Sequence, residues 1–314
     1  WLQTEAPRYS DKPWVLFVSL VCPHPPLIAP PEFFNLYPLD QIPLPIQHDA
    51  ASWPMHPAMQ DLRQCFNFVE PFDETTLRQA MAAYFALCSS LDHHIGRILH
   101  VLEETGLAAT TRVIYTSDHG ESFGNRGLWG KFTMYEESAG IPLIMAGADV
   151  PQGQRCTTPV SLIDCFPSIL QCVGAQPHPD DADLPGHSLF AMAQGEVPER
   201  TILSEYHAAG SRTASFMIRQ GPYKYVHYVA YPPQLFDLAT DPNEEHDLAT
   251  SSAHQQVLAE CEAALRAIVD PEAVDALAKS DQAEKVAAYG GQEAVKARGS
   301  FGYTPAPGEP VVYV

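Results

Sequence analysis

An apolar stripe at helical spacing runs through residues 77–102 and limits the folds open to this chain more than any other feature. Its members recur every three or four positions: Leu77, Met81, Tyr84, Cys88, Leu91, Ile95, Ile98 and Leu102. This period predicts one long amphipathic helix, with Asp73 as its N-cap and Gly106 at its end. His93 and His94 fall inside the helix. Because adjacent helical residues diverge, we interpret them as exposed surface rather than as metal ligands.

Strand-like segments lie before and after this helix. Residues 13–21, rich in Val, Leu and Phe, predict a buried strand, and 112–118 and 141–147 predict two more. A further helix is expected over 160–175. Dense prolines over 22–57 exclude regular helix and indicate a long ordered loop. This alternation of strands and helices predicts an α/β sheet covered on both faces.

The sequence pattern changes after the Pro- and Asp-rich segment 176–186. Short β runs with turn residues between them predict a small antiparallel sheet, namely "RTILSEY", "ASFMIRQ" and "YKYVHYV". A helix is expected at about 251–268, before a charged, Ala-rich stretch and a final tail. We therefore divide the chain into part of an α/β domain (1–186), a small sheet with a helix (187–270) and an extended C-terminal tail (271–314).

The balance of charged residues excludes some classes of partner. The formal net charge is −20, from 38 acidic and 18 basic residues among 314, and no basic stripe is present, so we expect no nucleic acid partner. No apolar run approaches the roughly 20 residues of a membrane helix, so we expect no membrane partner. Seven cysteines without a CxxC pair indicate neither a disulfide framework nor a zinc ribbon. Reduced thiols favour a cytoplasmic location.

The expected strand at 112–118 ends on Asp118, which is followed by His119 and Gly120. Ligands of open α/β sheets bind beyond the carboxyl ends of the strands. A carboxylate beside an imidazole suits a divalent ion such as Mn²⁺, or Ca²⁺ if the other ligands are oxygens. A turn with an Asp cap is the alternative interpretation.

A lysine follows this pair thirteen residues after Asp118. Lys131 ends a loop that contains Gly124, Gly127 and Gly130, so the loop is able to fold back, and Trp129 could anchor it against the core. A lysine held in this way would be a point charge for a tetrahedral oxyanion. The alternative is an ordinary surface lysine.

His24 stands in "CPHPP", directly after the expected strand at 13–21. Prolines on both sides would stiffen its backbone, and an imidazole there could donate a hydrogen bond or a proton to a leaving group. A histidine in a rigid turn is the alternative interpretation.

Together these elements resemble the sulfatase family of the alkaline-phosphatase superfamily. The matching segments are "PHPP", "TSDHGE" and "GLWGK", "IPLI", "SLIDCFPSIL" and "YKYV" with "PQLFDLATDPNEEHDLA", and they cover about 13–250. The Asp-His pair and the C-terminal tail look most like the choline-sulfatase and phosphonate monoester hydrolase branch. The resemblance implies an alkaline-phosphatase-like mixed sheet between helices, here without its N-terminal strands, plus the small antiparallel C-terminal subdomain.

The resemblance also implies a chemistry. Asp118 and His119 would be ligands of one divalent metal ion, Ca²⁺ or Mn²⁺. Lys131 and His24 would contact the sulfate or phosphonate group of a small anionic ester and its leaving oxygen. Arg126 is interpreted either as a residue that helps to shape the substrate pocket or as an exposed loop arginine. The organic part of the substrate cannot be assigned from spacing.

The nucleophile that the resemblance implies is a formylglycine made from Cys or Ser in a C/S-x-P-x-R motif. The sequence contains no such motif, and the Asp pair that would complete the metal site is missing too. "CFPSI" at 165–169 has Ile169 where Arg is required. Cys165 also lies on a helix whose Phe166 and Ile169 look like core, so we interpret it as a buried structural thiol.

Two explanations account for the missing motifs. The chain is either the C-terminal portion of a longer hydrolase, inactive by itself, or a degenerate paralogue. The second leaves open a non-enzymatic binding module, or a homo-oligomer formed through Phe301, Tyr303 and Tyr313 of the aromatic, Pro-rich tail.

Overall fold

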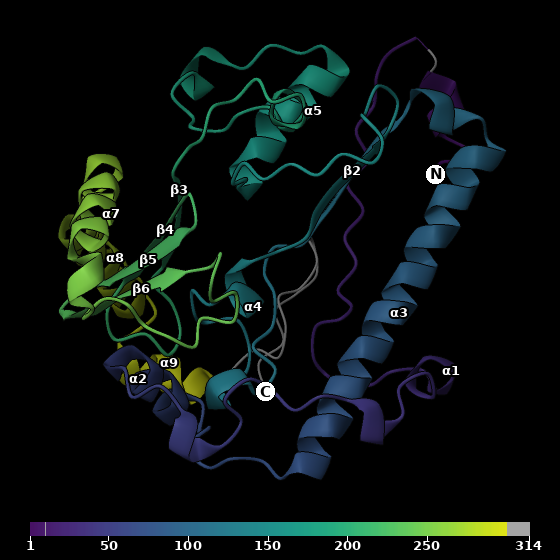
Figure 1. Ribbon diagram of the computed structural model, residues 1–314. Helices are drawn as coiled ribbons and strands as arrows, with labels where there is room; N and C mark the ends of the chain where they lie inside the picture. Colours follow the sequence, from purple (N-terminus) through teal and green to yellow (C-terminus); the bar gives the residue numbers. More distant parts are fainter. Residues whose placement is uncertain (10, 300–314) are drawn as a thin grey trace.

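The computed structural model of the protein describes residues 1–9 and 11–299. The helices are α1 Pro31–Phe34, α2 Pro57–Cys65, α3 Glu74–Glu104, α4 Glu136–Ala139, α5 Cys165–Val173, α6 Leu189–Ala193, α7 Gln255–Ile268, α8 Pro271–Ala288 and α9 Gln292–Arg298. The strands are β1 Arg112–Thr116, β2 Leu143–Gly147, β3 Ile202–Tyr206, β4 Ser215–Gln220, β5 Tyr223–Tyr228 and β6 Tyr231–Asp237. Figure 1 shows α3 on one side of the molecule and the β3–β6 sheet with α7 and α8 on the other.

Helix α3 confirms the long helix predicted from the apolar stripe. The Asp73 carboxylate caps its first turn by accepting the Thr76 N–H at 3.0 Å. Gly106 follows the helix at a φ of 73°, a conformation that favours glycine. On one side of the helix, Met81 and Ala82 pack with Ile42 and Phe123 in a buried cluster. The helix therefore supports both the proline-rich loop and the loop that follows β1.

Strands β1 and β2 pair antiparallel, with Ile114 opposite Met145. Both strands were predicted, and β1 ends two residues before Asp118. The helix predicted over 160–175 is also present as α5, which Gly174 ends in the left-handed conformation. Together with the helices, this two-stranded sheet gives the predicted mixed α/β class. The cover expected on both faces is not found among the described residues, because Ile144 of β2 is 59% exposed.

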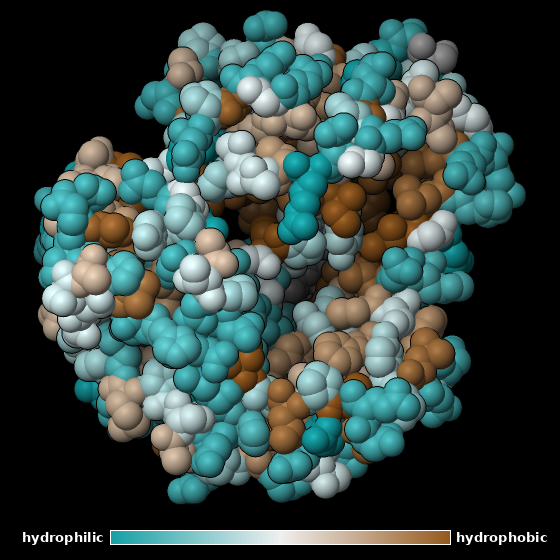
Figure 2. Space-filling model, viewed as in Figure 1, coloured by the Kyte–Doolittle hydropathy of each residue, from teal (hydrophilic) through white to brown (hydrophobic). Residues whose placement is uncertain are grey.

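Residues 13–21 form no strand, and the strand predicted there is wrong. The backbone of 13–20 makes no hydrogen bond to any other segment of the described chain. Phe17 and Val21 are 88% and 78% exposed. A strand exists only where a neighbouring backbone pairs with it, and no described strand lies alongside. Figure 2 shows hydrophobic residues along a hollow on the viewed face of the molecule.

Helix α5 differs from its expected burial for a related reason. Phe166 and Ile169, which look like core residues in the sequence, are exposed. The buried side of α5 carries Ser168 instead, whose Oγ donates to Asp164 O at 2.6 Å and accepts the Leu189 N–H at 2.8 Å. The apolar side of this helix is only partly covered by the described elements.

The C-terminal sheet is antiparallel throughout, in the order β3-β4-β5-β6. Its first three strands were predicted. Strand β6 was not, because Pro232 and Pro233 lie within it, and proline cannot donate to a ladder. The strand is tolerated because it lies at the edge of the sheet. The small antiparallel subdomain is therefore confirmed, with one strand more than expected.

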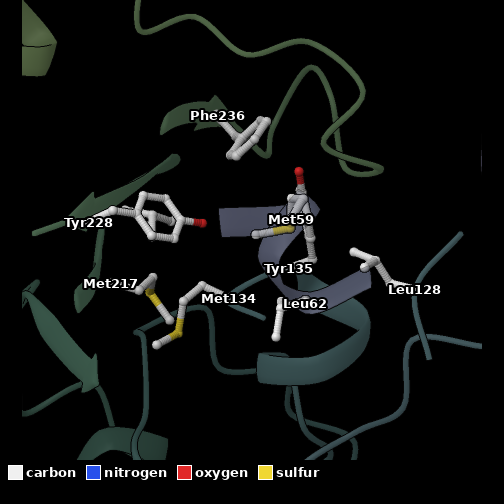
Figure 3. Packing of buried hydrophobic residues seen from close by; sticks show 9 residues of the cluster. Met59, Leu62, Leu128, Met134, Tyr135, Met217, Tyr228 and Phe236 are labelled. Carbon is white, nitrogen blue, oxygen red and sulfur yellow. The ribbon is translucent and has the colours of Figure 1, made fainter. Parts of the chain in front are cut away.

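The two faces of this sheet have different partners. One face packs on α7 through a buried cluster that includes Phe216, Leu235 and Leu265. The other face contacts α2 and the segment that follows Lys131. Its buried cluster consists of Met59, Leu62, Leu128, Met134, Tyr135, Met217, Val226, Tyr228 and Phe236 (Figure 3). The C-terminal sheet is thus joined through its core to the candidate site.

The region after α7 is helical where an extended tail was expected. Residues 271–288 and 292–298 form α8 and α9, and the Asp270 side chain caps α8. The tail residues expected to mediate oligomer contacts, Phe301, Tyr303 and Tyr313, lie outside the described residues, so that contact stays a prediction. No helix among the described residues has the length and apolar character needed to cross a membrane.

We predict that acid weakens the N-terminus of α2 through His56. His56 Nε2–H donates to Pro232 O at 2.8 Å, and Nδ1 accepts the Ala58 N–H at 3.3 Å; the bond at Nδ1 requires the neutral ring. Burial lowers the pKa of His56. The unfolded chain therefore binds the proton first, and stability falls as the pH drops below about 6.5.

Thermal melts at pH 7.5 and 5.5 test this prediction. The Tm of the wild-type protein should fall more than that of His56→Asn, whose Oδ1 can accept the same Ala58 bond without titrating. Equal losses in the two proteins would show that His56 does not contribute to the acid sensitivity.

Candidate functional site

The turn after β1 holds Asp118 and His119 in a fixed backbone conformation. Asp118 Oδ1 accepts the His119 N–H at 3.0 Å, and Ser117 Oγ donates to His119 O at 2.7 Å. The Asp118 side chain is 82% exposed. The turn thus directs the carboxylate into open space beyond the end of the strand.

His119 is held as one tautomer by a backbone carbonyl. Its Nδ1 lies 2.8 Å from Gly120 O, and because a carbonyl oxygen only accepts, Nδ1 carries the proton. Nε2 therefore presents a free lone pair, 3.6 Å from Asp118 Oδ2. A nitrogen and an oxygen donor are thus close enough to bind the same cation.

The loop from Gly120 to Lys131 folds back on itself, as its glycines predicted. Ser122 N donates to Gly130 O at 2.8 Å, and Gly124 N donates to Leu128 O at 2.7 Å. The Glu121 carboxylate accepts the Gly130 N–H, so it joins the start of the loop to its end. Sequence reasoning missed this role of Glu121, although a carboxylate three residues after Asp118 was a visible signal.

Trp129 anchors the loop in the way that was predicted. Its ring lies against Phe72, with ring centroids 5.5 Å apart, and against Phe123, at 6.3 Å. Phe123 in turn contacts Tyr84 of α3 edge to face at 4.0 Å. The aromatic contacts tie the loop to the long helix.

Lys131 lies beside His24, a residue 107 positions earlier in the chain. Lys131 Nζ is 3.0 Å from His24 Nε2. His24 Nδ1 lies 2.7 Å from Pro25 O, which again requires the proton on Nδ1 and leaves Nε2 as the acceptor. The lysine ammonium therefore donates to the imidazole. Two residues that were singled out separately in the sequence are in direct contact.

Arg126 is fully buried, so its interpretation as an exposed loop arginine is wrong. Its guanidinium bonds to the Glu137 carboxylate and to Asn243 O, and it lies 4.0 Å over the Tyr135 ring. This arginine does not point into solvent, where a substrate could reach it. Its neighbours belong to α4 and to the loop after β6.

The donors at this turn amount to only part of a metal site. Within residues 1–9 and 11–299, no group of three or more His, Cys, Asp or Glu side chains gathers in a form that could hold an ion. Asp118 and His119 provide two donors, and His93 and His94 are exposed on α3. The arrangement can supply two ligands and, at Lys131, one cation for an anion.

The cysteines are free thiols without the features of a nucleophile. Cys165 is half-buried rather than buried, and desolvation raises its pKa. Cys22 Sγ lies 3.3 Å from Leu87 O, and burial raises its pKa as well. A raised pKa disfavours the thiolate, so neither thiol is activated.

Comparison with protein-family models shows the family to which the chain belongs. The sulfatase family model matches residues 2–175, more than half of the chain. The chain belongs to the sulfatase family. A second model, N-sulphoglucosamine sulphohydrolase, C-terminal, matches 124–270, so the likeness continues through the C-terminal sheet.

Two curated relatives illustrate the likeness. A choline-sulfatase from Rhizobium meliloti (strain 1021) is 33% identical over 301 residues, which cover 92% of this chain and 57% of that protein. Arylsulfatase K from Xenopus laevis is 30% identical over 296 residues, covering 86% of this chain and 54% of the relative. The chain thus spans about half the length of these relatives.

A solved structure confirms the predicted fold class. A phosphonate monoester hydrolase from Silicibacter pomeroyi superimposes with a TM-score of 0.68 at 29% identity, over 82% of this sulfatase-family chain and 56% of that one. This similarity supports the alkaline-phosphatase-like architecture predicted from the motifs.

We predict that the tip of the 120–131 loop tolerates no side chain at Gly127. A Cβ there would lie 2.2 Å from the Trp53 ring, at a φ of +68°. Gly127→Ala combines overpacking with backbone strain and should lower stability by about 2–4 kcal/mol.

Gly153→Ala is the matched control, because Gly153 has a φ of +67° and nothing within 4 Å of the added Cβ. The free energies of unfolding of both variants in urea separate the cost of overpacking from the cost of backbone strain. Equal losses would mean that contact with Trp53 does not restrict this loop.

Proposed function

We propose that the protein is part of a hydrolase of sulfate monoesters. The observation that carries the proposal is the 3.0 Å contact between Lys131 and His24, at the end of the loop that begins with Asp118 and His119. It stands in a chain of the sulfatase family, and relatives of the chain are a choline-sulfatase and an arylsulfatase.

A divalent metal ion is the cofactor in this proposal, as Mn²⁺ or Ca²⁺. The oxygen and nitrogen donors of Asp118 and His119, 3.6 Å apart, fit two positions of such a site. When bound, the ion would lower the charge cost of attack on the ester. The other ligands would come from residues outside this pair.

The binding and proton-transfer roles fall to Lys131 and His24. The Lys131 ammonium would bind an oxygen of the tetrahedral group as a point charge. His24 keeps Nδ1–H on Pro25 O and accepts the Lys131 ammonium at Nε2. Once released by the lysine and protonated, Nε2 would give its proton to the leaving oxygen. An arriving anion would compete with His24 for the lysine.

Phosphonate monoesters and phosphodiesters are the alternative substrates. They are favoured by the similarity to the phosphonate monoester hydrolase, which includes 29% sequence identity as well as the shared fold. Sulfate and phosphonate groups are both tetrahedral anions, so one lysine and one histidine can serve either centre.

The nucleophile of the proposed reaction is not among these residues. No C/S-x-P-x-R motif occurs in the 314 residues, and a formylglycine supplied by a preceding segment is the form that the family implies. A non-catalytic binding protein is the second candidate, favoured by the incomplete donor set at the turn.

Lys131→Ala tests the proposed site. In the longer protein we expect sulfatase turnover to fall by about 10²-fold or more, because one charge-stabilising contact is lost. Lys285→Ala, on the exposed side of α8, is the control and should keep full activity. Full turnover in Lys131→Ala would contradict the role of this lysine. Measurable sulfatase activity in the pure 314-residue chain would contradict the need for a further segment.

We also propose a reducing compartment, consistent with the predicted cytoplasmic location. All seven cysteines are free in the structure, and they make no disulfide. Mass spectrometry of the alkylated native protein should find seven reduced thiols, and a native disulfide would contradict this proposal.

A further inference from the structure

Two fully buried cations lie beneath the candidate site. Arg126 is 0% exposed, and Lys224, the second residue of β5, is 1% exposed. Charged side chains are almost never buried to this extent unless they are paired. Both cations pair with residues of helix α4, which also accepts the backbone N–H groups of the two residues that follow His119.

Helix α4 is the direct support of the metal-ligand turn. Gly120 N donates to Ser138 O at 2.8 Å, and Glu121 N donates to Glu137 O at 2.7 Å. Glu121 then bonds through its carboxylate to the N–H of Gly130, next to Lys131. Any shift of α4 would therefore reach both ends of the loop.

Arg126 fixes α4 from the side of the loop. Its guanidinium bonds to the Glu137 carboxylate and to the carbonyl of Asn243, which lies after β6. Its backbone carbonyl accepts from Arg63 Nη2 at 2.7 Å. The loop, α4 and the C-terminal subdomain thus meet at one buried side chain.

Lys224 fixes α4 from the side of the sheet. Its Nζ lies 2.6 Å from Glu136 Oε1 and 2.8 Å from Glu244 Oε1, and it donates to Met134 O at 2.8 Å. Glu244 Oε2 accepts the Glu136 N–H at 2.6 Å. Side chains of the C-terminal subdomain thus hold the start of α4 from this side.

Stability by itself does not account for this network. Buried ion pairs are weak contributors to stability, since apolar residues of similar volume often serve as well or better. What a buried pair supplies is a defined geometry, because each charge must keep its partner. The contacts run without a break from β5 to α4, and from α4 to the loop that carries Asp118, His119 and Lys131.

We propose that Lys224 and Arg126, together with Glu244, are positioning residues that set the geometry of the anion site through α4. The C-terminal sheet is then part of the functional site rather than an appendage. This inference rests on the proposed function for the meaning of the site, but the network itself can be tested separately.

The test compares variants of the 314-residue chain by two measurements. Lys224→Met removes the charge, Lys224→Arg restores it, and Lys224→Met with Glu244→Gln removes both partners if the single variant does not fold. Arg200→Met is the matched control, because Arg200 pairs at 2.8 Å with the buried Asp164 and shares no hydrogen bond with α4. The measurements are amide hydrogen exchange and the Kd of inorganic sulfate from NMR titration of His24 and Lys131.

We expect Lys224→Met, or the double variant, to lose at least about tenfold protection at Gly120, Glu121 and Gly130 while α3 keeps its protection. Its sulfate Kd should rise by about tenfold, Lys224→Arg should recover both, and Arg200→Met should change neither. Unchanged loop protection and sulfate affinity would overturn the inference, as would a uniform loss across the chain. Failure of the wild-type chain to bind sulfate would contradict the proposed anion site, and hydrogen exchange would still decide the positioning role.

Discussion

The buried ion pair between Arg126 and Glu137 is the contact on which the candidate site depends. It joins the fully buried Arg126 of the 120–131 loop to the largely buried Glu137 of α4, and the backbone carbonyls of Glu137 and Ser138 in turn accept hydrogen bonds from Glu121 and Gly120. The pair helps to hold the loop in one conformation, in which the chain leaves β1, passes Trp129 and returns to Lys131. A charge buried so completely keeps its partner, because separation would leave it uncompensated.

In this arrangement, a few residues would be enough to form the proposed anion site in a strongly acidic chain. The Lys131 ammonium donates to His24 Nε2, and both histidines of the candidate site keep Nδ1–H on a backbone carbonyl. In our proposal the site has one wall in this chain, with Asp118 and His119 as two metal ligands and Lys131 as the cation. The chain spans about half the length of its curated sulfatase relatives, and the opposite wall in our proposal carries the nucleophile.

Sequence reasoning predicted what depends on local pattern. The stripe of α3, the strands β1 and β2, and the turn at Asp118 follow from periodicity and from residues with strong local preferences. The strand at 13–21 failed because pairing requires a neighbour, which local composition does not report. The burial expected for Phe166 was wrong for the same reason. The buried role of Lys224 could not be predicted, because its partners Glu136 and Glu244 are far from it and from each other in the sequence. A lysine within a strand pattern also gives no sign that its side chain is buried.

The most direct test of the central claim is a crystal structure of the chain soaked with MnSO₄, with data collected at the manganese absorption edge. The account predicts an anomalous peak in contact with Asp118 and His119 Nε2, and a sulfate in contact with Lys131 Nζ. The account would be contradicted if manganese and sulfate bound elsewhere, with no manganese at Asp118 and His119 and no sulfate at Lys131.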